Sequence, residues 1–387
     1  EDVETVMPFN QYQTSLNEYI WNMKEETVTF KNDKGDFGRF TSIHPDQDSL
    51  IFEGKTAFYD LKSNELKIGG VEEIQTCDAF VYLDTGLVEI YKGAKMKTLE
   101  NARIVANTTN KYHVINRATV DILGKKDYRA KGFYEYNIGS RKQEIEFADI
   151  IGTRVGKGNR SEKKTVTRAN GEVTKEDGFY IDHKTEYRGK IALNAESKNL
   201  NFEGFARLDV PSMVRRNWFS VKFEGDKNDL AIQYEEPKNY LGDPLRTGIF
   251  ISKTSAKIYP SIMMPLYVRK DRKIFEARDD NGKGIFKYDL KDDRFVFGDS
   301  LLMTSGTLQG NKMIYANKNK KITAEGKFHI GSGLNYISVK AAGRAETTFA
   351  EGEVEETDFP EPGDTKVDFQ LMAGVDAIIP EKLLKIM

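Results

Sequence analysis

A strict alternation of apolar and charged residues limits the folds open to this chain more than any other feature. Between Val28 and Phe349, short segments read apolar–charged–apolar, for example Leu66-Lys67-Ile68, Val88-Glu89-Ile90 and Val221-Lys222-Phe223. Successive side chains of a strand point to opposite faces, so this pattern places apolar residues on one face and charges on the other. Half-buried strands of this kind are typical of antiparallel sheets, because parallel strands buried on both faces read as continuous apolar runs.

Turn-forming residues separate these segments at short intervals. They include Asp84-Thr85-Gly86, Asn170-Gly171, Gly225-Asp226 and Asp280-Asn281-Gly282. Asn, Asp and Gly tolerate the backbone conformations that tight hairpins need. The sequence therefore predicts a succession of antiparallel hairpins.

The first 28 residues show a different period. Tyr12, Leu16, Tyr19, Ile20 and Met23 fall at i, i+4, i+7, i+8 and i+11, which is the spacing of an apolar stripe on an α-helix. We expect a short amphipathic helix here that packs on the first strands and covers an open sheet edge.

The strands also repeat a sequence unit. Tyr59-Asp60-Leu61-Lys62 with Gly69 aligns without a gap with Tyr288-Asp289-Leu290-Lys291 with Gly298, and weaker copies begin at Tyr134 and Tyr315. A two-strand unit cannot bury its own apolar face, so copies must stack and share a core. The predicted fold class is all-β: an elongated repetitive antiparallel β-solenoid or open β-jellyroll with a short N-terminal helix. A series of ordinary β-sandwiches is the alternative.

Changes in composition suggest boundaries along the chain. Residues 154–178 are basic and Gly-rich, and 346–364 are acidic with two prolines. The predicted organisation is an N-terminal amphipathic helix (1–28), a first β-repeat region (29–153), a basic loop (154–178), a second β-repeat region (179–345), an acidic linker (346–364) and the start of a further unit (365–387).

Overall composition excludes several classes of protein. With 58 basic and 60 acidic residues the formal net charge is −2, which argues against a nucleic-acid-binding protein. No apolar run approaches the ~18 residues of a membrane-spanning helix. The single cysteine, Cys77, leaves no disulfide framework and no Cys-based zinc site.

Catalytic signals are weak. His44, His113, His183 and His329 are dispersed, without metal-ligand spacing, and neither a G-x-S-x-G elbow nor a phosphate-binding glycine loop occurs. Asp279-Asp280-Asn281-Gly282 resembles the start of a calcium loop but lacks the bidentate Glu at position twelve, so a plain β-turn is the simpler interpretation. We expect no enzyme activity, no metal and no cofactor.

The apolar face of the strands is the remaining candidate for a binding site. It would serve either as core alone or as a groove for lipid acyl chains, since burial stabilises each methylene by about 0.8 kcal/mol. The residues predicted to form this lining are Leu66, Ile68, Val88, Ile90, Ile145, Phe147, Val221, Phe223, Phe295 and Phe297.

One segment resembles a known family. Residues 54–71, with Ala57-Phe58-Tyr59-Asp60, a polar turn and an alternating strand that ends in Gly69, look like one repeat of the organic-solvent-tolerance-like family. That family includes the periplasmic lipopolysaccharide-transport proteins of diderm bacteria. The resemblance implies an open, twisted β-jellyroll whose interior carries acyl chains.

Together these observations predict a non-enzymatic, extracytoplasmic scaffold segment of a large bacterial cell-envelope protein, in the periplasm or at the cell surface, that holds or conducts lipid acyl chains. Its partners would be other envelope proteins or further segments of the same chain, with lipid or glycan as ligand and no nucleic acid. The alternative is a surface adhesion or polysaccharide-binding protein, with Tyr134, Tyr136 or Trp218 as an exposed stacking platform. A polysaccharide-processing enzyme is a third hypothesis.

Overall fold

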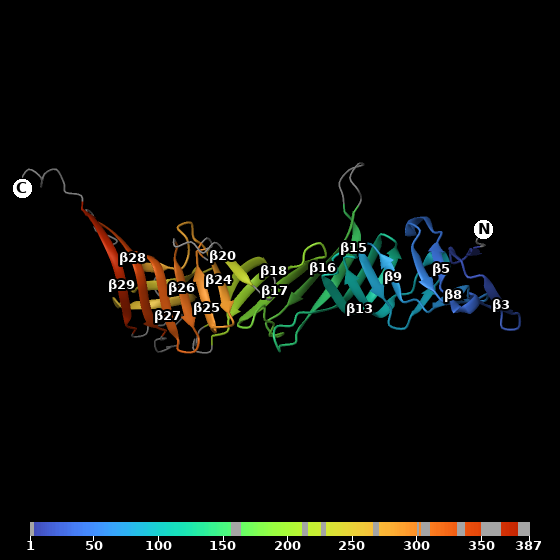
Figure 1. Ribbon diagram of the computed structural model, residues 1–387, viewed down its shortest axis with the longest axis horizontal. Coiled ribbons are helices and arrows are strands. Elements are labelled where there is room, and N and C mark those ends of the chain that lie inside the picture. Colours follow the sequence, from blue (N-terminus) through green and yellow to red (C-terminus); the bar gives the residue numbers. More distant parts are fainter. Residues whose placement is uncertain are drawn as a thin grey trace, which may run out of the picture. The chain divides into compact units, whose positions relative to one another are not determined.

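The protein is built of antiparallel sheets that belong to two compact units (Figure 1). The computed structural model describes residues 4–155, 164–210, 216–225, 230–265, 271–299, 302, 310–330, 337–349 and 365–377. The first unit comprises Glu1–Val173 with Lys190–Asn201, and the second comprises Thr174–Gly189 with Phe202–Met387. The predicted all-β, antiparallel architecture is confirmed.

The predicted N-terminal helix is wrong, because strands occupy its place. Tyr12 lies on one strand and is buried, whereas Tyr19 and Ile20 lie on the next and are exposed. Residues 15–17 connect these two strands and interrupt the helical period, and positive φ angles at Gln11 (53°) and Glu26 (56°) mark turns on either side of the stripe. The apolar residues at helical spacing thus point to different faces of separate strands.

The first unit contains two small sheets and most of a large one. The four-stranded sheet has the order β1 (Thr5–Met7), β2 (Tyr12–Thr14), β5 (Gly38–Ser42), β6 (Ile51–Gly54). The five-stranded sheet has the order β11 (Leu87–Ile90), β8 (Glu65–Gly69), β7 (Thr56–Asp60), β4 (Thr27–Lys31), β3 (Glu18–Asn22). Neighbouring strands of the large sheet run β9 (Glu73–Thr76), β10 (Ala79–Tyr82), β12 (Leu99–Ala106), β13 (His113–Gly124), β14 (Asp127–Glu135), β15 (Glu144–Val155), β16 (Lys164–Val173). The connections include three 3₁₀ turns, η1 (Asp33–Gly35), η2 (Pro45–Gln47) and η3 (Lys92–Ala94).

The second unit is centred on a seven-stranded sheet whose strands β24 to β29 lie side by side in Figure 1, from orange to red. Its order is β20 (Ala231–Glu235), β24 (Lys283–Asp289), β25 (Arg294–Gly298), β26 (Lys312–Ala316), β27 (Lys321–Phe328), β28 (Ile337–Thr348), β29 (Val367–Ala377). A three-stranded sheet has the order β22 (Ile258–Pro265), β21 (Leu245–Ile251), β23 (Arg272–Glu276). Strands β17 (Thr185–Asn194) and β18 (Leu200–Leu208) have residues in both units, and β19 (Phe219–Gly225) follows β18.

The structure describes parts of the predicted basic loop, acidic linker and further unit. The basic segment 154–178 contributes the end of β15 and all of β16, and residues 156–163 lie outside the described residues. Of the acidic segment 346–364, residues 346–348 end β28 and 350–364 are not described. Strand β29 pairs along its length with β28, so residues 367–377 extend the sheet of the second unit instead of opening a further one. Residues 378–387 of that predicted further unit lie outside the described residues.

The predicted repeat forms the same hairpin in both units. Tyr59 pairs with Leu66 and Asp60 with Glu65, just as Tyr288 pairs with Phe295 and Asp289 with Arg294. In each copy the aspartate accepts backbone N–H groups of the turn, and the tyrosine donates to the side chain five residues later. Four hairpins share this four-residue turn, and the last turn residue has a positive φ in each: Glu26, Asn64, Asp293, Lys320.

The copy predicted at Tyr134 does not form this turn. Beyond β14 the backbone N–H of Tyr136 donates to the carbonyl of Gln143 at 2.9 Å, which closes a longer loop. The sequence resemblance at Tyr134 is therefore limited to the strand.

Neighbouring turns are joined by a ladder of hydrogen bonds. The backbone N–H of Leu61 donates to the carbonyl of Glu26 at 3.0 Å, and that of Asn317 donates to the carbonyl of Asp293 at 3.1 Å. Each bond links the start of one turn to the left-handed residue of the turn before it. Repeated turns therefore stack in register, as the strands behind them do.

Candidate functional site

The candidate site is the apolar face of each small-strand sheet, built from alternate residues of hairpins. In the first unit a row of directly opposed residues crosses five strands: Val88, Ile68, Ala57, Phe30, Tyr19. The first four are buried, whereas Tyr19 is 69 % exposed. This face is therefore buried where it lies on β11 and β8 and exposed to solvent on the edge strand β3.

A second row of the same sheet behaves in the same way. Its members are Ile90, Leu66, Tyr59, Val28 and Trp21. Ile90 and Leu66 are fully buried, and Trp21 on β3 is 58 % exposed. We call these two rows the N-terminal inner face.

The four-stranded sheet covers the sealed half of this face. Gly54 on β6 allows the approach, because a Cβ there would lie 2.6 Å from Cγ2 of Ile68 and 3.3 Å from Cγ2 of Val71. Phe40 and Phe52 stack on the same covering sheet, with ring centroids 5.7 Å apart. Two sheets packed face to face in this way exclude water from the inner ends of both rows.

The second unit has a corresponding surface, which we call the C-terminal inner face. Phe286, Phe297, Met313 and Ala324 are buried, and Phe369 on the edge strand β29 is only half-buried. Farther along β29 the same face carries Val375, which is 63 % exposed. The opposed residues that form the row are Phe286, Phe297, Met313, Ala324, Ala345, Phe369.

The three-stranded sheet covers the inner part of this second face. Phe275 of β23 lies against Phe328 of β27 with ring centroids 5.0 Å apart, and the backbone N–H of His329 donates to the carbonyl of Ile274 at 2.7 Å. Beyond β27 the face continues onto β28 and β29, where exposure increases.

The structure places the ten predicted lining residues in separate groups. Leu66 opposes Ile90 and Ile68 opposes Val88, so these four meet on the N-terminal inner face. Ile145 and Phe147 lie on β15, Val221 and Phe223 on β19, and Phe295 and Phe297 on β25 of the C-terminal inner face. All are buried except Phe223, which is half-buried and stacks on Phe202 at 4.9 Å. One lining that runs through both units remains a prediction.

Sequence reasoning missed the residues at which these faces open. Tyr19 and Trp21 alternate along β3, but the helical stripe with Tyr12 and Leu16 concealed that alternation. Leu371 and Val375 lie on the same face of β29. The strand spacing of Val367-Asp368-Phe369-Gln370-Leu371 predicts this strand, but the sequence places it in a further unit.

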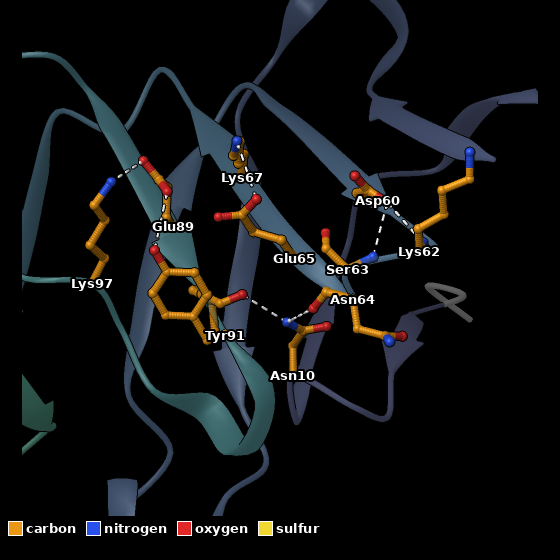
Figure 2. A network of polar contacts seen from close by, with 11 residues as sticks. Asn10, Asp60, Lys62, Ser63, Asn64, Glu65, Lys67, Glu89, Tyr91 and Lys97 are labelled. Atoms are coloured by element: carbon orange, nitrogen blue, oxygen red, sulfur yellow. Dashed lines mark hydrogen bonds and ion pairs between the residues drawn. The ribbon is translucent and has the colours of Figure 1, made fainter. Parts of the chain in front are cut away.

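Polar contacts of turns and strands lie along one edge of the N-terminal inner face (Figure 2). Asn10 donates from Nδ2 to the carbonyl of Asn64 at 3.0 Å and to that of Ile90 at 2.7 Å. On the outer side of β11 the Lys97 ammonium, 2.9 Å from Glu89, holds the pKa of that carboxyl below its usual range. Polar groups thus border the apolar rows without entering them.

Among the described residues, the groups relevant to catalysis or metal binding are a half-buried thiol, a hydrogen-bonded turn and dispersed histidines and carboxylates. Burial raises the pKa of the Cys77 thiol to about 12, so the thiol stays protonated at neutral pH and is a poor nucleophile. Within the described part of the chain, no three or more His, Cys, Asp or Glu side chains gather as metal ligands. The turn at Asp279 is a hydrogen-bonded β-turn in which Oδ1 accepts the N–H groups of Asn281 and Lys283.

The aromatic residues considered for sugar stacking are mostly covered. Tyr136 is 3 % and Trp218 is 9 % exposed, and the guanidinium groups of Arg188 and Arg207 lie 4.6 and 4.7 Å from the Trp218 ring. Neither residue can form the exposed platform that the sequence suggested.

Comparison with known proteins adds no relative. Neither the models of protein families, nor curated protein sequences, nor solved structures give a match to this chain. A search of the described helices finds none with the length and apolar character needed to span a membrane.

Proposed function

We propose that the protein is a non-enzymatic scaffold segment of an extracytoplasmic bacterial envelope protein and that its inner faces hold lipid acyl chains in an open β-jellyroll arrangement. The observation that carries this proposal is the gradient of exposure along both inner faces. On the first face both rows begin fully buried on β11 and end exposed on the edge strand, at Tyr19 and Trp21. On the second face the row that begins at buried Phe286 ends at half-buried Phe369 on the edge strand, and Val375, farther along that strand on the same face, is 63 % exposed.

An uncovered apolar row is a site for an apolar ligand. Exposed aromatic and aliphatic side chains arranged in one row on a soluble surface mark interaction sites. Burial of ten methylenes against such a row contributes about 8 kcal/mol before ordering costs. The turn and strand pattern of residues 54–71, which resembles the organic-solvent-tolerance-like repeat, supports an acyl chain as the ligand.

The edge strands also support the proposed role as a scaffold. Among the described strands, β3 pairs only with β4, and β29 pairs only with β28. Each therefore leaves a row of backbone donors and acceptors for a further strand. Another envelope protein, or another segment of the same chain, would extend the sheet by pairing there and would lengthen the apolar row.

Lipid extraction from the purified chain followed by mass spectrometry tests the proposal. We expect bound acyl chains in the wild-type protein. Trp21→Glu should lower the bound amount, whereas Ile20→Glu should leave it unchanged, because Ile20 is 61 % exposed on the opposite face of the same strand. At the other edge, Val375→Glu and Met372→Glu form the corresponding pair.

Two results would contradict the proposal. One is a wild-type protein that carries no lipid and takes up no fluorescent fatty acid. The other is an equal loss of lipid in Trp21→Glu and Ile20→Glu, which would indicate non-specific adsorption to the edge strand.

A further inference from the structure

Two aromatic side chains stand next to each other on the outer face of the large sheet in the first unit. Phe80 and Tyr82 alternate along β10 with Ala79 and Val81, which are fully buried, so both rings point away from the core. Their centroids lie 6.5 Å apart, and both side chains are half-buried. This position is on the opposite side of the sheet from the buried core residues.

A cation lies over each ring. Arg103 opposes Tyr82 in the β10–β12 register, with its guanidinium carbon 4.5 Å from the ring centroid. The Lys111 ammonium is 5.5 Å from the centroid of Phe80. Neither cation forms an ion pair with a carboxylate of the described residues, and both side chains belong to exposed residues. A guanidinium stacked on a ring keeps its N–H edge free for an anion.

Turn and strand hydrogen bonds order the backbone that carries these cations. Lys111 follows a turn in which Oδ1 of Asn107 accepts the N–H groups of Thr109 and Asn110 at 3.0 and 3.2 Å. The N–H of Lys111 then donates to the carbonyl of Asn107 at 2.9 Å. Arg103 stands on a strand paired on both sides. Because this backbone is already ordered, less conformational entropy is lost when an anion binds.

A third cation on the same sheet differs in one respect. The guanidinium carbon of Arg117 lies 4.6 Å from the Phe133 ring, but its Nη2 also pairs with Glu144 at 2.6 Å. Arg117 is thus stacked in the same way as Arg103 while its charge is already satisfied.

The carboxylate of Glu73 borders the patch. Glu73 opposes Tyr82 from β9, and a hydrogen bond from the Tyr82 hydroxyl to Glu73 raises the pKa of that tyrosine. We call the group formed by Phe80, Tyr82, Arg103 and Lys111 the outer cation–aromatic patch. It carries two cations, with Glu73 beside Tyr82.

We propose that the outer cation–aromatic patch binds an acidic polysaccharide through the carboxylates of its sugars. Arg103 provides paired N–H donors for one carboxylate, and Lys111 provides a point charge for the next. The exposed rims of the Phe80 and Tyr82 rings contact the C–H face of the sugar between them. The cations cover the ring faces, so nucleic-acid bases have no free aromatic face on which to stack. The net charge of −2 also argues against the strongly basic surface that nucleic-acid-binding proteins have.

Affinity electrophoresis in native gels that contain polygalacturonate, with dextran as the neutral comparison, tests this site. We expect retardation by polygalacturonate only, and a steep loss of retardation as salt rises. Arg103→Gln should weaken binding about tenfold, the effect of one charge-assisted hydrogen bond. Lys111→Gln should also weaken binding, and Glu73→Gln should strengthen it by removal of the neighbouring acid.

Arg117→Gln is the matched control, because it removes a stacked arginine whose charge Glu144 already neutralises. Circular dichroism of each variant confirms that the sheet is retained. The proposal is overturned if wild-type protein is not retarded by polygalacturonate at low salt, if Arg117→Gln weakens binding as much as Arg103→Gln, or if single-stranded DNA or anionic vesicles bind more tightly than polygalacturonate.

Discussion

The side-chain amide of Asn10 donates a hydrogen bond of 3.0 Å to the backbone carbonyl of Asn64, which lies 54 residues later in the chain. The same Nδ2 atom reaches the carbonyl of Ile90 at 2.7 Å (Figure 2). In the hairpins at Glu26 and Asp293 the equivalent carbonyl accepts a backbone N–H of the next turn. Asn10 therefore replaces a backbone donor where the ladder of turns in the first unit reaches its last hairpin.

Asn10→Ala should destabilise the first unit markedly. Both carbonyls would lose their donor, and an unsatisfied buried polar group costs about 1–3 kcal/mol. Urea unfolding followed by circular dichroism measures the loss. Asn22→Ala is the control, because its bond to Glu25 is exposed, and we expect a clearly smaller effect. Equal effects would show that Asn10 is not a cap of the ladder.

Lys320→Gly should stabilise the hairpin between β26 and β27. Lys320 has a φ of 56°, which glycine adopts without steric cost and a lysine does not. We expect a gain of up to about 1 kcal/mol, reduced by the greater freedom of glycine in the unfolded chain. Lys318→Gly, two residues earlier in the same turn, should lose stability. A loss in Lys320→Gly would mean that the lysine side chain, and not its backbone, supports the turn.

The stability of the first unit should fall in mild acid because of His113. Its ring is buried, Nε2 lies 2.7 Å from the carbonyl of Ser197, and burial lowers the pKa of the imidazole below its usual value of 6.5. The unfolded chain then binds the proton more readily than the folded one, so stability is complete above pH 6.5 and declines as pH falls below it.

Urea midpoints at a series of pH values between 7.5 and 5 test this expectation. The wild-type midpoint should fall across that interval, and His113→Gln should show a flatter profile in it, although its stability at pH 7.5 will be lower. A wild-type midpoint that rises on acidification would contradict the assignment.

Tryptophan fluorescence should report occupancy of the N-terminal inner face. The chain has two tryptophans, of which Trp21 is 58 % and Trp218 is 9 % exposed. In a Trp218→Phe variant the emission of Trp21 should be that of a solvent-exposed indole and should be quenched by acrylamide. Addition of a fatty acid should shift it to shorter wavelength and protect it. No change on addition of fatty acid, with binding shown by another method, would place the ligand elsewhere.

Local sequence was sufficient where a single hairpin decides the structure. The match between Tyr59-Asp60 and Tyr288-Asp289 predicts a shared unit, and the structure gives both copies the same register and the same tyrosine hydrogen bond. The physical reason is that an Asx turn and the alternation of its two strands are set by residues within about ten positions of one another.

The same local reasoning failed where two turns lay close together. Tyr12, Leu16 and Tyr19 satisfy a helical period, yet they belong to β2, the following loop and β3. The turn after Asn22 has the same length as that after Asp60, with its last residue, Glu26, in the left-handed conformation. Asn22 accepts the N–H of Glu25, just as Asp60 accepts the N–H of Ser63. The turn-forming Asn22 is therefore a sequence signal for a hairpin that competes with the helical spacing.

Alternation and turn chemistry act between near neighbours, so the amino-acid sequence is enough to predict antiparallel hairpins with one apolar face. How far each apolar face is covered depends on tertiary packing. Ile68 and Tyr19 lie in one row, but β6 packs against Ile68 at Gly54, whereas Tyr19 is 69 % exposed. Coverage depends on sheets that meet across long separations in the chain, and no local pattern encodes which strand is left at the edge.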